Sequence, residues 1–146
     1  MSARIRYLSC LPGLLLAGTL AAQGTPAPAV DVAVFAIEAG SSADTQLTRL
    51  AHQLTARLVG ALQSRKLSVG RARASDTVTA RVSVHGSLTG EAGAYTAELR
   101  LLQGRAGEEL RSYMFGPGDV KGVLGLADRA APRIAAVVDQ LGPSGR

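Results

Sequence analysis

The feature that most constrains this chain is a change in the spacing of its apolar residues near residue 45. From residue 45 to residue 66, leucines recur every three or four positions and fall on one face of a helix, while polar residues fall away from it. Arg65 and Lys66 are predicted to end this helix, because cations suit the negative end of its dipole. An apolar face of this length predicts packing against a sheet. The leucine stripe consists of Leu47, Leu50, Leu54, Leu58 and Leu62.

Strands are predicted on both sides of this helix. Residues 30–38, VDVAVFAIE, are apolar on both faces, as expected of a central strand that is covered on both sides. The turn at residues 40–44 ends in Asp44, which can cap the helix. Residues 67–71 form a short second strand. A strand, a helix and a strand in this order predict a crossover between two parallel strands.

The second half of the chain alternates apolar and polar residues, which predicts a three-stranded meander. Its strands are expected at residues 77–88, 95–103 and 108–115, and residues 116–119 should break the last of them. In the first of these strands, the alternation places Val78, Ala80, Val82 and Val84 on one face.

A last helix is predicted from residue 120 to residue 141, capped by Asp119 and kinked or split at Pro132. The fold class is therefore α/β. We expect a single mixed β-sheet of about five strands, in the order β-α-β-β-β-β-α, flanked by two long helices.

The N-terminus has the three-part pattern of a secretory signal. Arg4 and Arg6 precede a mostly apolar run, and small residues follow at Ala21 and Ala22. The run is too short to span a membrane, and Pro12 interrupts it. Cys10, the one cysteine of the chain, lies inside the run, so no cysteine follows it to carry a lipid anchor.

The predicted organisation is one domain between short terminal segments. The protein should be exported to the periplasm, with no stable membrane span after the signal is cleaved. We predict a signal peptide at 1–22, a proline-containing linker at 23–29, the domain at 30–141 and a flexible tail at 142–146.

Four short stretches follow one another along the chain, and their order and spacing are more specific than any one of them. They are VAVFAI at 32–37, the leucines Leu50, Leu54 and Leu58, HGSL at 85–88, and LRLLQGRAGE at 99–108. In this order they resemble the N-terminal domain of TolB and its relatives, the FlgO-type and CsgG-like envelope proteins. The resemblance implies a non-catalytic binding or assembly role in the envelope and names no partner. The chain departs from the pattern at residues 71–76, which replace a second helix, and at Gln103, which replaces an acidic residue.

The spacing of reactive residues favours no enzyme. His52 and His85 are the only histidines and lie on different predicted elements, so they do not make a metal site. The glycine motifs of nucleotide-binding loops and the nucleophile elbow of hydrolases are missing from the sequence. Glu108 and Glu109 are adjacent and would point to opposite faces of a strand. We therefore expect a non-catalytic protein without a metal or a cofactor.

Three groups of residues are candidate binding sites. Gly40, Ser41 and Ser42 precede a helix N-terminus, where backbone amides can hold an anion. The last strand of the meander is expected to form a sheet edge that offers Arg111, Tyr113, Met114 and Phe115 to a partner. A basic patch consists of Arg65, Lys66, Arg71, Arg73 and Arg81.

These features favour an exported protein-interaction or assembly module of the bacterial cell envelope. A small-ligand or anion-binding periplasmic domain that uses the turn at Gly40 is the alternative. The expected partners are other envelope proteins, or a second copy in a homo-oligomer. The net charge of +5 includes Arg4 and Arg6 of the signal, and few aromatic residues accompany the basic ones, so we expect no nucleic-acid partner.

Overall fold

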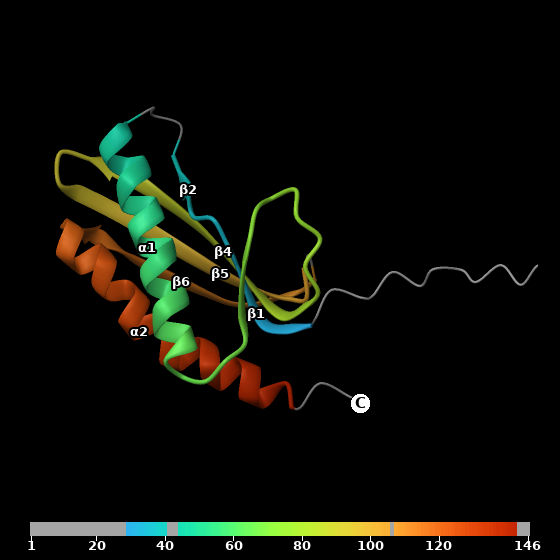
Figure 1. Ribbon diagram of the computed structural model, residues 1–146. Coiled ribbons are helices and arrows are strands. Elements are labelled where there is room, and N and C mark those ends of the chain that lie inside the picture. The colour runs from blue at the N-terminus through green and yellow to red at the C-terminus, as the bar shows by residue number, and fades with distance from the viewer. Residues whose placement is uncertain (1–28, 41–43, 106, 143–146) are drawn as a thin grey trace, which may run out of the picture.

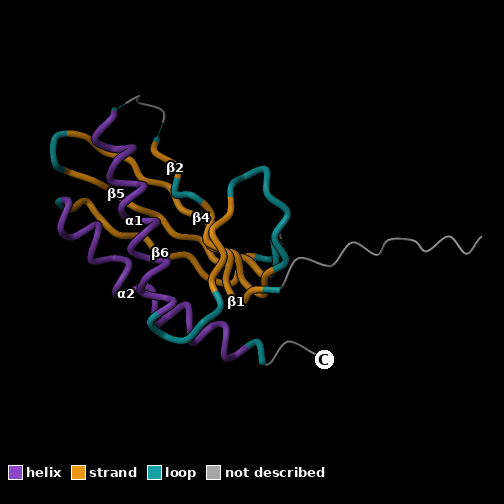
Figure 2. The backbone as a smooth tube through the Cα atoms, in the orientation of Figure 1, coloured by secondary structure: helices purple, strands orange, loops and turns teal. Residues whose placement is uncertain are grey.

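The computed structural model describes residues 29–40, 44–105 and 107–142 (Figure 1). The predicted signal peptide, Ser41, Ser42, and nearly all of the predicted linker and tail lie outside these residues. Within them the chain forms six strands and two helices (Figure 2). In chain order these are β1 (Val30–Phe35), β2 (Glu38–Ala39), α1 (Thr45–Gln63), β3 (Val69–Ala72), β4 (Ala80–Glu91), β5 (Ala94–Gln103), β6 (Glu109–Gly118) and α2 (Val120–Gln140).

The strands form a single mixed sheet, which confirms the predicted fold class. Its order is β3-β1-β4-β5-β6, and the short strand β2 pairs with the far part of β4. β1 is parallel to both β3 and β4, as the predicted crossover requires. β4, β5 and β6 form the antiparallel meander. β3 and β6 are therefore the two ends of the main sheet.

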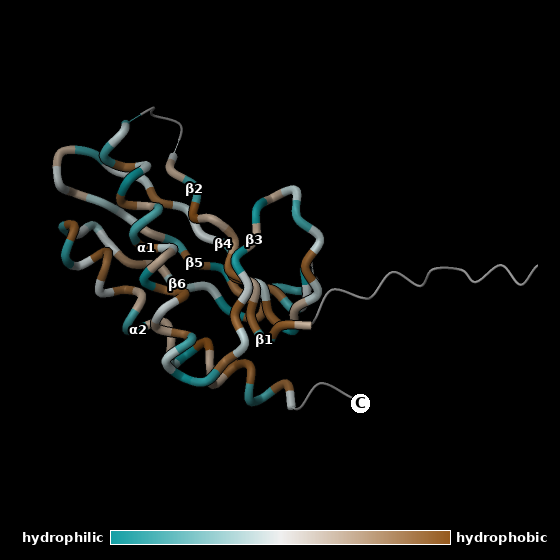
Figure 3. The backbone as a smooth tube through the Cα atoms, in the orientation of Figure 1, coloured by the Kyte–Doolittle hydropathy of each residue, from teal (hydrophilic) through white to brown (hydrophobic). Residues whose placement is uncertain are grey.

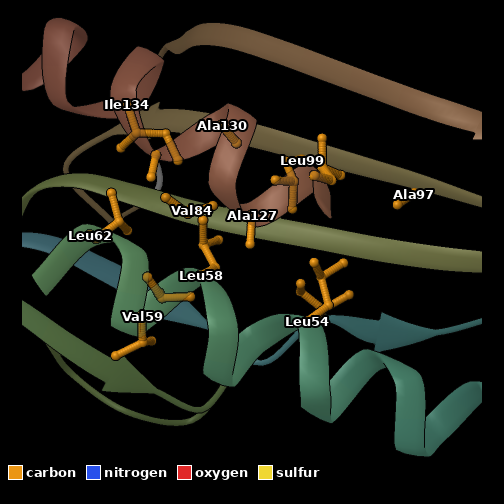
Figure 4. Close-up of a cluster of buried hydrophobic side chains, with 14 of the residues drawn as sticks. Leu54, Leu58, Val59, Leu62, Val84, Ala97, Leu99, Ala127, Ala130 and Ile134 are labelled. Carbon is orange, nitrogen blue, oxygen red and sulfur yellow. The ribbon is translucent and has the colours of Figure 1, made fainter. Parts of the chain in front are cut away.

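Both helices lie against one another and share one hydrophobic core with the sheet (Figure 1). Their tubes alternate between apolar and polar colours in Figure 3, as expected of helices with one buried face. All five leucines of the predicted stripe are buried. Figure 4 shows part of this core, which includes Leu54, Leu58 and Leu62 of α1, Val84 and Leu99 of the sheet, and Ala127, Ala130 and Ile134 of α2.

Hydrogen bonds at its two ends set the length of α1. The Asp44 carboxylate accepts a hydrogen bond from the Gln46 amide at 2.8 Å, so the predicted cap is confirmed. The helix ends at Gln63, earlier than predicted. Ser64 donates back to the Gly60 carbonyl at 2.9 Å, and Lys66 adopts a left-handed φ of 63°. Arg65 and Lys66 therefore follow the helix instead of forming its last turn.

The opposite face of β1 carries a second, smaller cluster. Ala33 and Phe35 are buried there together with Ala72 of β3. The predicted burial of both faces of this strand is thus correct. However, Val78 and Ala80 pack against this second cluster, not with Val82 and Val84 as the alternation predicted. Ala80 is the first residue of β4 and pairs with Val30, which also packs against the second cluster.

The predicted break of the last strand at residues 116–119 is wrong. β6 continues to Gly118, through Gly116 and Pro117, and Gly118 pairs with Tyr95. A proline is tolerated here because β6 is an edge strand, whose outer amides are not needed for the ladder. Gly116 has a φ of 127°, and a Cβ at this position would lie 2.6 Å from the Tyr95 carbonyl oxygen.

α2 runs through Pro132 without being split. The missing amide of a proline removes one intrahelical hydrogen bond. Ala131 and Ile134, on either side of Pro132, are fully packed against the core and hold the segment helical. The predicted cap at Asp119 is confirmed, since its carboxylate accepts from the Gly122 amide at 2.8 Å.

Candidate functional site

The β6 edge is the longest open edge of the sheet. In the described part of the chain, this ten-residue strand pairs with β5 alone, whereas β3 at the other end has four residues. Tyr113 pairs with Leu99, whose side chain belongs to the core beneath the helices. By alternation, Arg111, Tyr113 and Phe115 face α2, and Met114 faces the opposite side of the sheet. Met114 is 74% exposed.

Two arginines of α2 cover the aromatic rings of β6. The guanidinium carbon of Arg129 lies 4.6 Å from the centroid of the Phe115 ring, and that of Arg133 lies 5.7 Å from the centroid of the Tyr113 ring. Arg129 also donates to the Gly122 carbonyl at 3.1 Å. Together α2 and β6 enclose a groove of about 330 Å³, which we call the α2–β6 seam. The seam is lined by Ser112, Tyr113, Met114, Phe115, Leu126, Arg129, Ala130 and Arg133.

The three predicted contact residues Tyr113, Met114 and Phe115 differ in exposure. Tyr113 and Phe115 are half-buried against the core and lie beneath the two arginines. Only Met114 presents a bare apolar side chain. Arg129 and Arg133 were not predicted as site residues from the sequence. Their four-residue spacing places them on one face of a helix, but only the sheet order shows that this face borders β6.

The predicted basic patch is divided. Arg65, Lys66, Arg71 and Arg73 are exposed, on β3 and in the segments that flank it. Arg81 does not belong with them. Its guanidinium contacts the Asp31 carboxylate at 3.4 Å and donates to the Val138 carbonyl at 2.8 Å, and only 18% of its side chain is exposed. Arg81 therefore ties β4 to β1 and to the end of α2.

Gly40 and Asp44 are the two described ends of the predicted anion-binding turn, and both already make hydrogen bonds within the chain. The Gly40 amide donates to the Leu88 carbonyl at 2.7 Å. The Asp44 carboxylate sits on the first amides of α1 and would repel an anion there. Ser41 and Ser42 lie between these ends, outside the described residues, so their role stays a prediction.

A separate pocket of about 440 Å³ opens on the face of β4 and β5 that bears the second cluster. His85 stacks on Phe35 here, with ring centroids 4.3 Å apart, and its Nε2 lies 3.2 Å from the Ser83 hydroxyl. Burial lowers the pKa of His85 below its ordinary value of 6.5. Arg100 points along the same wall, but its guanidinium is bonded to Glu109 at 2.6 Å. Two acidic and two basic side chains, Glu38, Glu98, Arg100 and Arg105, also line the pocket.

The described residues also bear on a metal site and on a membrane span. These residues contain no group of three or more His, Cys, Asp or Glu side chains that could hold a metal ion. His52 is exposed on α1. Neither described helix combines the length and the apolar character that a membrane crossing needs.

No protein-family model matches this sequence, and no curated protein matches it. Protein XCC0632 from Xanthomonas campestris, of the DUF330 family, has a similar fold, with a TM-score of 0.51 over 80% of this chain and 89% of that chain at 8% identity. The PelC dodecamer from Paraburkholderia phytofirmans aligns with a TM-score of 0.46 over 77% of this chain and 89% of that chain at 17% identity. At 8% identity, the likeness to XCC0632 shows a shared fold and nothing more. The resemblance to TolB, FlgO and CsgG proteins therefore stays a prediction.

Proposed function

We propose that this chain is an exported, non-catalytic interaction or assembly module of the bacterial cell envelope, and that it binds an extended segment of another envelope protein along β6. The observation that carries the proposal is the length of the β6 edge in a sheet whose other end is short. An unpaired edge presents a row of amides and carbonyls, and an extended segment can add to it as a further strand.

The surroundings of β6 support this mode of binding. The α2–β6 seam gives the added strand a groove on one side. Met114, which borders the seam, adds an exposed apolar side chain. The signal-like N-terminus supports export, and the lack of catalytic spacing in the sequence supports a binding role.

The test is recovery of crosslinked partners from cells that express tagged wild-type protein, Arg111→Pro or Met114→Asp. Both variants alter the edge without removing a fully buried side chain. We expect each to lose the partner and to keep the wild-type thermal midpoint. Leu141→Asp is a matched control, because it places the same charge on an exposed apolar residue at the end of α2. Unchanged recovery with both edge variants would contradict the proposal.

A small ligand is the second candidate, and the pocket beside His85 favours it over the turn at Gly40. This pocket combines an aromatic stack with hydroxyl, carboxylate and guanidinium groups. A thermal-shift screen with nucleotides, phosphates and metals separates the two readings, because a ligand of the native state raises the unfolding midpoint. A shift that His85→Gln abolishes would support the ligand site.

A further inference from the structure

Three arginines line the side of β6 that faces α2. Arg129 and Arg133 lie over the rings of Phe115 and Tyr113, and Arg111 lies on the strand itself, on the same side. All three are exposed. They form what we call the arginine strip.

The arginine strip has no carboxylate side chain of its own chain to neutralise it. Every Asp and Glu of the sequence belongs to the described residues. Among those residues the ion pairs join other arginines, namely Arg57, Arg81 and Arg100, to acidic side chains. The charge of the strip is therefore open to a partner.

The arginine strip also opposes pairing between copies of this chain. Antiparallel pairing of β6 with β6 of a second copy would put both α2 helices on the same face of the joined sheet. The two strips would then face each other. Pairing of β6 with β3 of a second copy would bring the exposed Arg71 to the same edge. Like charges on neighbouring strands destabilise their pairing.

From this arrangement we infer that the occupant of the β6 edge is an acidic extended segment of a different protein; the inference rests on the proposed function. In an added strand, the residues opposite Tyr113 and Phe115 point toward α2, with Cβ atoms about 4.5–5.5 Å from those of β6. Carboxylates at these alternate positions can reach Arg129 and Arg133 and form charge-assisted hydrogen bonds. The intervening residues face the side of Met114 and should be apolar. The partner sequence therefore alternates acidic and apolar residues.

The test uses labelled synthetic peptides of the length of β6, ten residues, and fluorescence anisotropy with the purified full chain. One peptide alternates Glu and Val, one alternates Lys and Val, and one has the composition of the first with its glutamates clustered. The proteins are wild type, Arg129→Glu/Arg133→Glu, and Arg49→Glu/Lys121→Glu. The last is a control with the same charge change at exposed helical residues outside the candidate sites.

We expect the alternating Glu peptide to bind wild type more tightly than the other two peptides. The double variant of the strip should weaken its binding by about tenfold or more and should favour the Lys peptide instead, while the control keeps most of the wild-type affinity. If the clustered peptide binds wild type as tightly as the alternating Glu peptide, the net charge alone determines the affinity, and the inference is overturned. Unchanged or undetectable binding of the Glu peptide across the three proteins would also overturn it. The proposed function fails separately, if Met114→Asp and Arg111→Pro leave partner recovery in cells unchanged.

Discussion

The guanidinium of Arg129 lies 4.6 Å above the ring of Phe115 and connects the last helix to the edge strand. The Phe115 ring also packs closely against Gly118 and Gly122. A Cβ atom at Gly118 would lie 2.7 Å from the ring, and one at Gly122 would lie 2.9 Å from it. Phe115 is thus held between Gly122, in the first turn of α2, and Arg129, about two turns further along the helix. This packing fixes the geometry of the α2–β6 seam.

The first prediction compares two glycines of α2. Alanine is the better helix former by about 1 kcal/mol, so Gly125→Ala, where a Cβ meets no atom within 4 Å, should raise the free energy of unfolding by about 0.5–1 kcal/mol. Gly122→Ala should lower it, because its Cβ would meet the Phe115 ring at 2.9 Å and the capping Asp119 Oδ1 at 3.1 Å. Urea denaturation measures both. Equal gains in the two variants would show that Phe115 is not held as described.

The second prediction concerns Thr55, whose buried hydroxyl joins α1 to the chain between β1 and β2. It accepts from the Ile37 amide at 3.1 Å and donates to the Ala51 carbonyl at 2.8 Å. Thr55→Val keeps the shape and leaves the Ile37 amide without its partner, which should cost about 1–3 kcal/mol of unfolding free energy. The control Thr48→Val removes an exposed hydroxyl that bonds the Asp44 carbonyl and should change stability by less than about 0.5 kcal/mol. Similar losses in both variants would contradict the bridging role of Thr55.

The third prediction is a pH dependence that arises at His85. Burial lowers its pKa in the folded protein below 6.5, so the unfolded chain binds a proton that the folded chain resists. Stability should therefore fall as the pH drops through about 6.5 toward the folded pKa. His85→Gln should flatten this loss in urea titrations between about pH 7.5 and about pH 5.5, whereas His52→Gln should keep it. A loss that is the same in His85→Gln would assign the dependence to other groups.

The local signals in the sequence predict local structure well. The leucine stripe, the cap residues Asp44 and Asp119, and the alternation of β5 all depend on neighbours a few positions apart, and the structure confirms each. The wrong predictions concern positions whose structure depends on contacts between residues far apart in the sequence. Pro117 fits within a strand because β6 is an edge, and Pro132 fits within a helix because Ala131 and Ile134 are packed.

The residues of the candidate site could likewise be predicted only where local sequence signals were sufficient. The sequence located the edge strand, but its faces depended on the pairing with β5, which turns Tyr113 and Phe115 toward α2. Arg81 was grouped with neighbouring basic residues, although Asp31 and the Val138 carbonyl bind it. The sequence gives no signal for Arg129 and Arg133 beyond their spacing. Their role depends on Tyr113 and Phe115, which lie more than ten residues away in the chain and are brought beneath them by the fold.

The most direct test of the account places a photo-crosslinking amino acid at Arg111 or Met114 of the protein in living cells. The same amino acid at His52, exposed on α1, is the control. If β6 binds the partner, an adduct with a single envelope protein is expected at both edge positions and none at position 52. The crosslinked site on the partner should lie in a segment that alternates acidic and apolar residues. Adducts only at position 52, or only with cytoplasmic proteins, would contradict it.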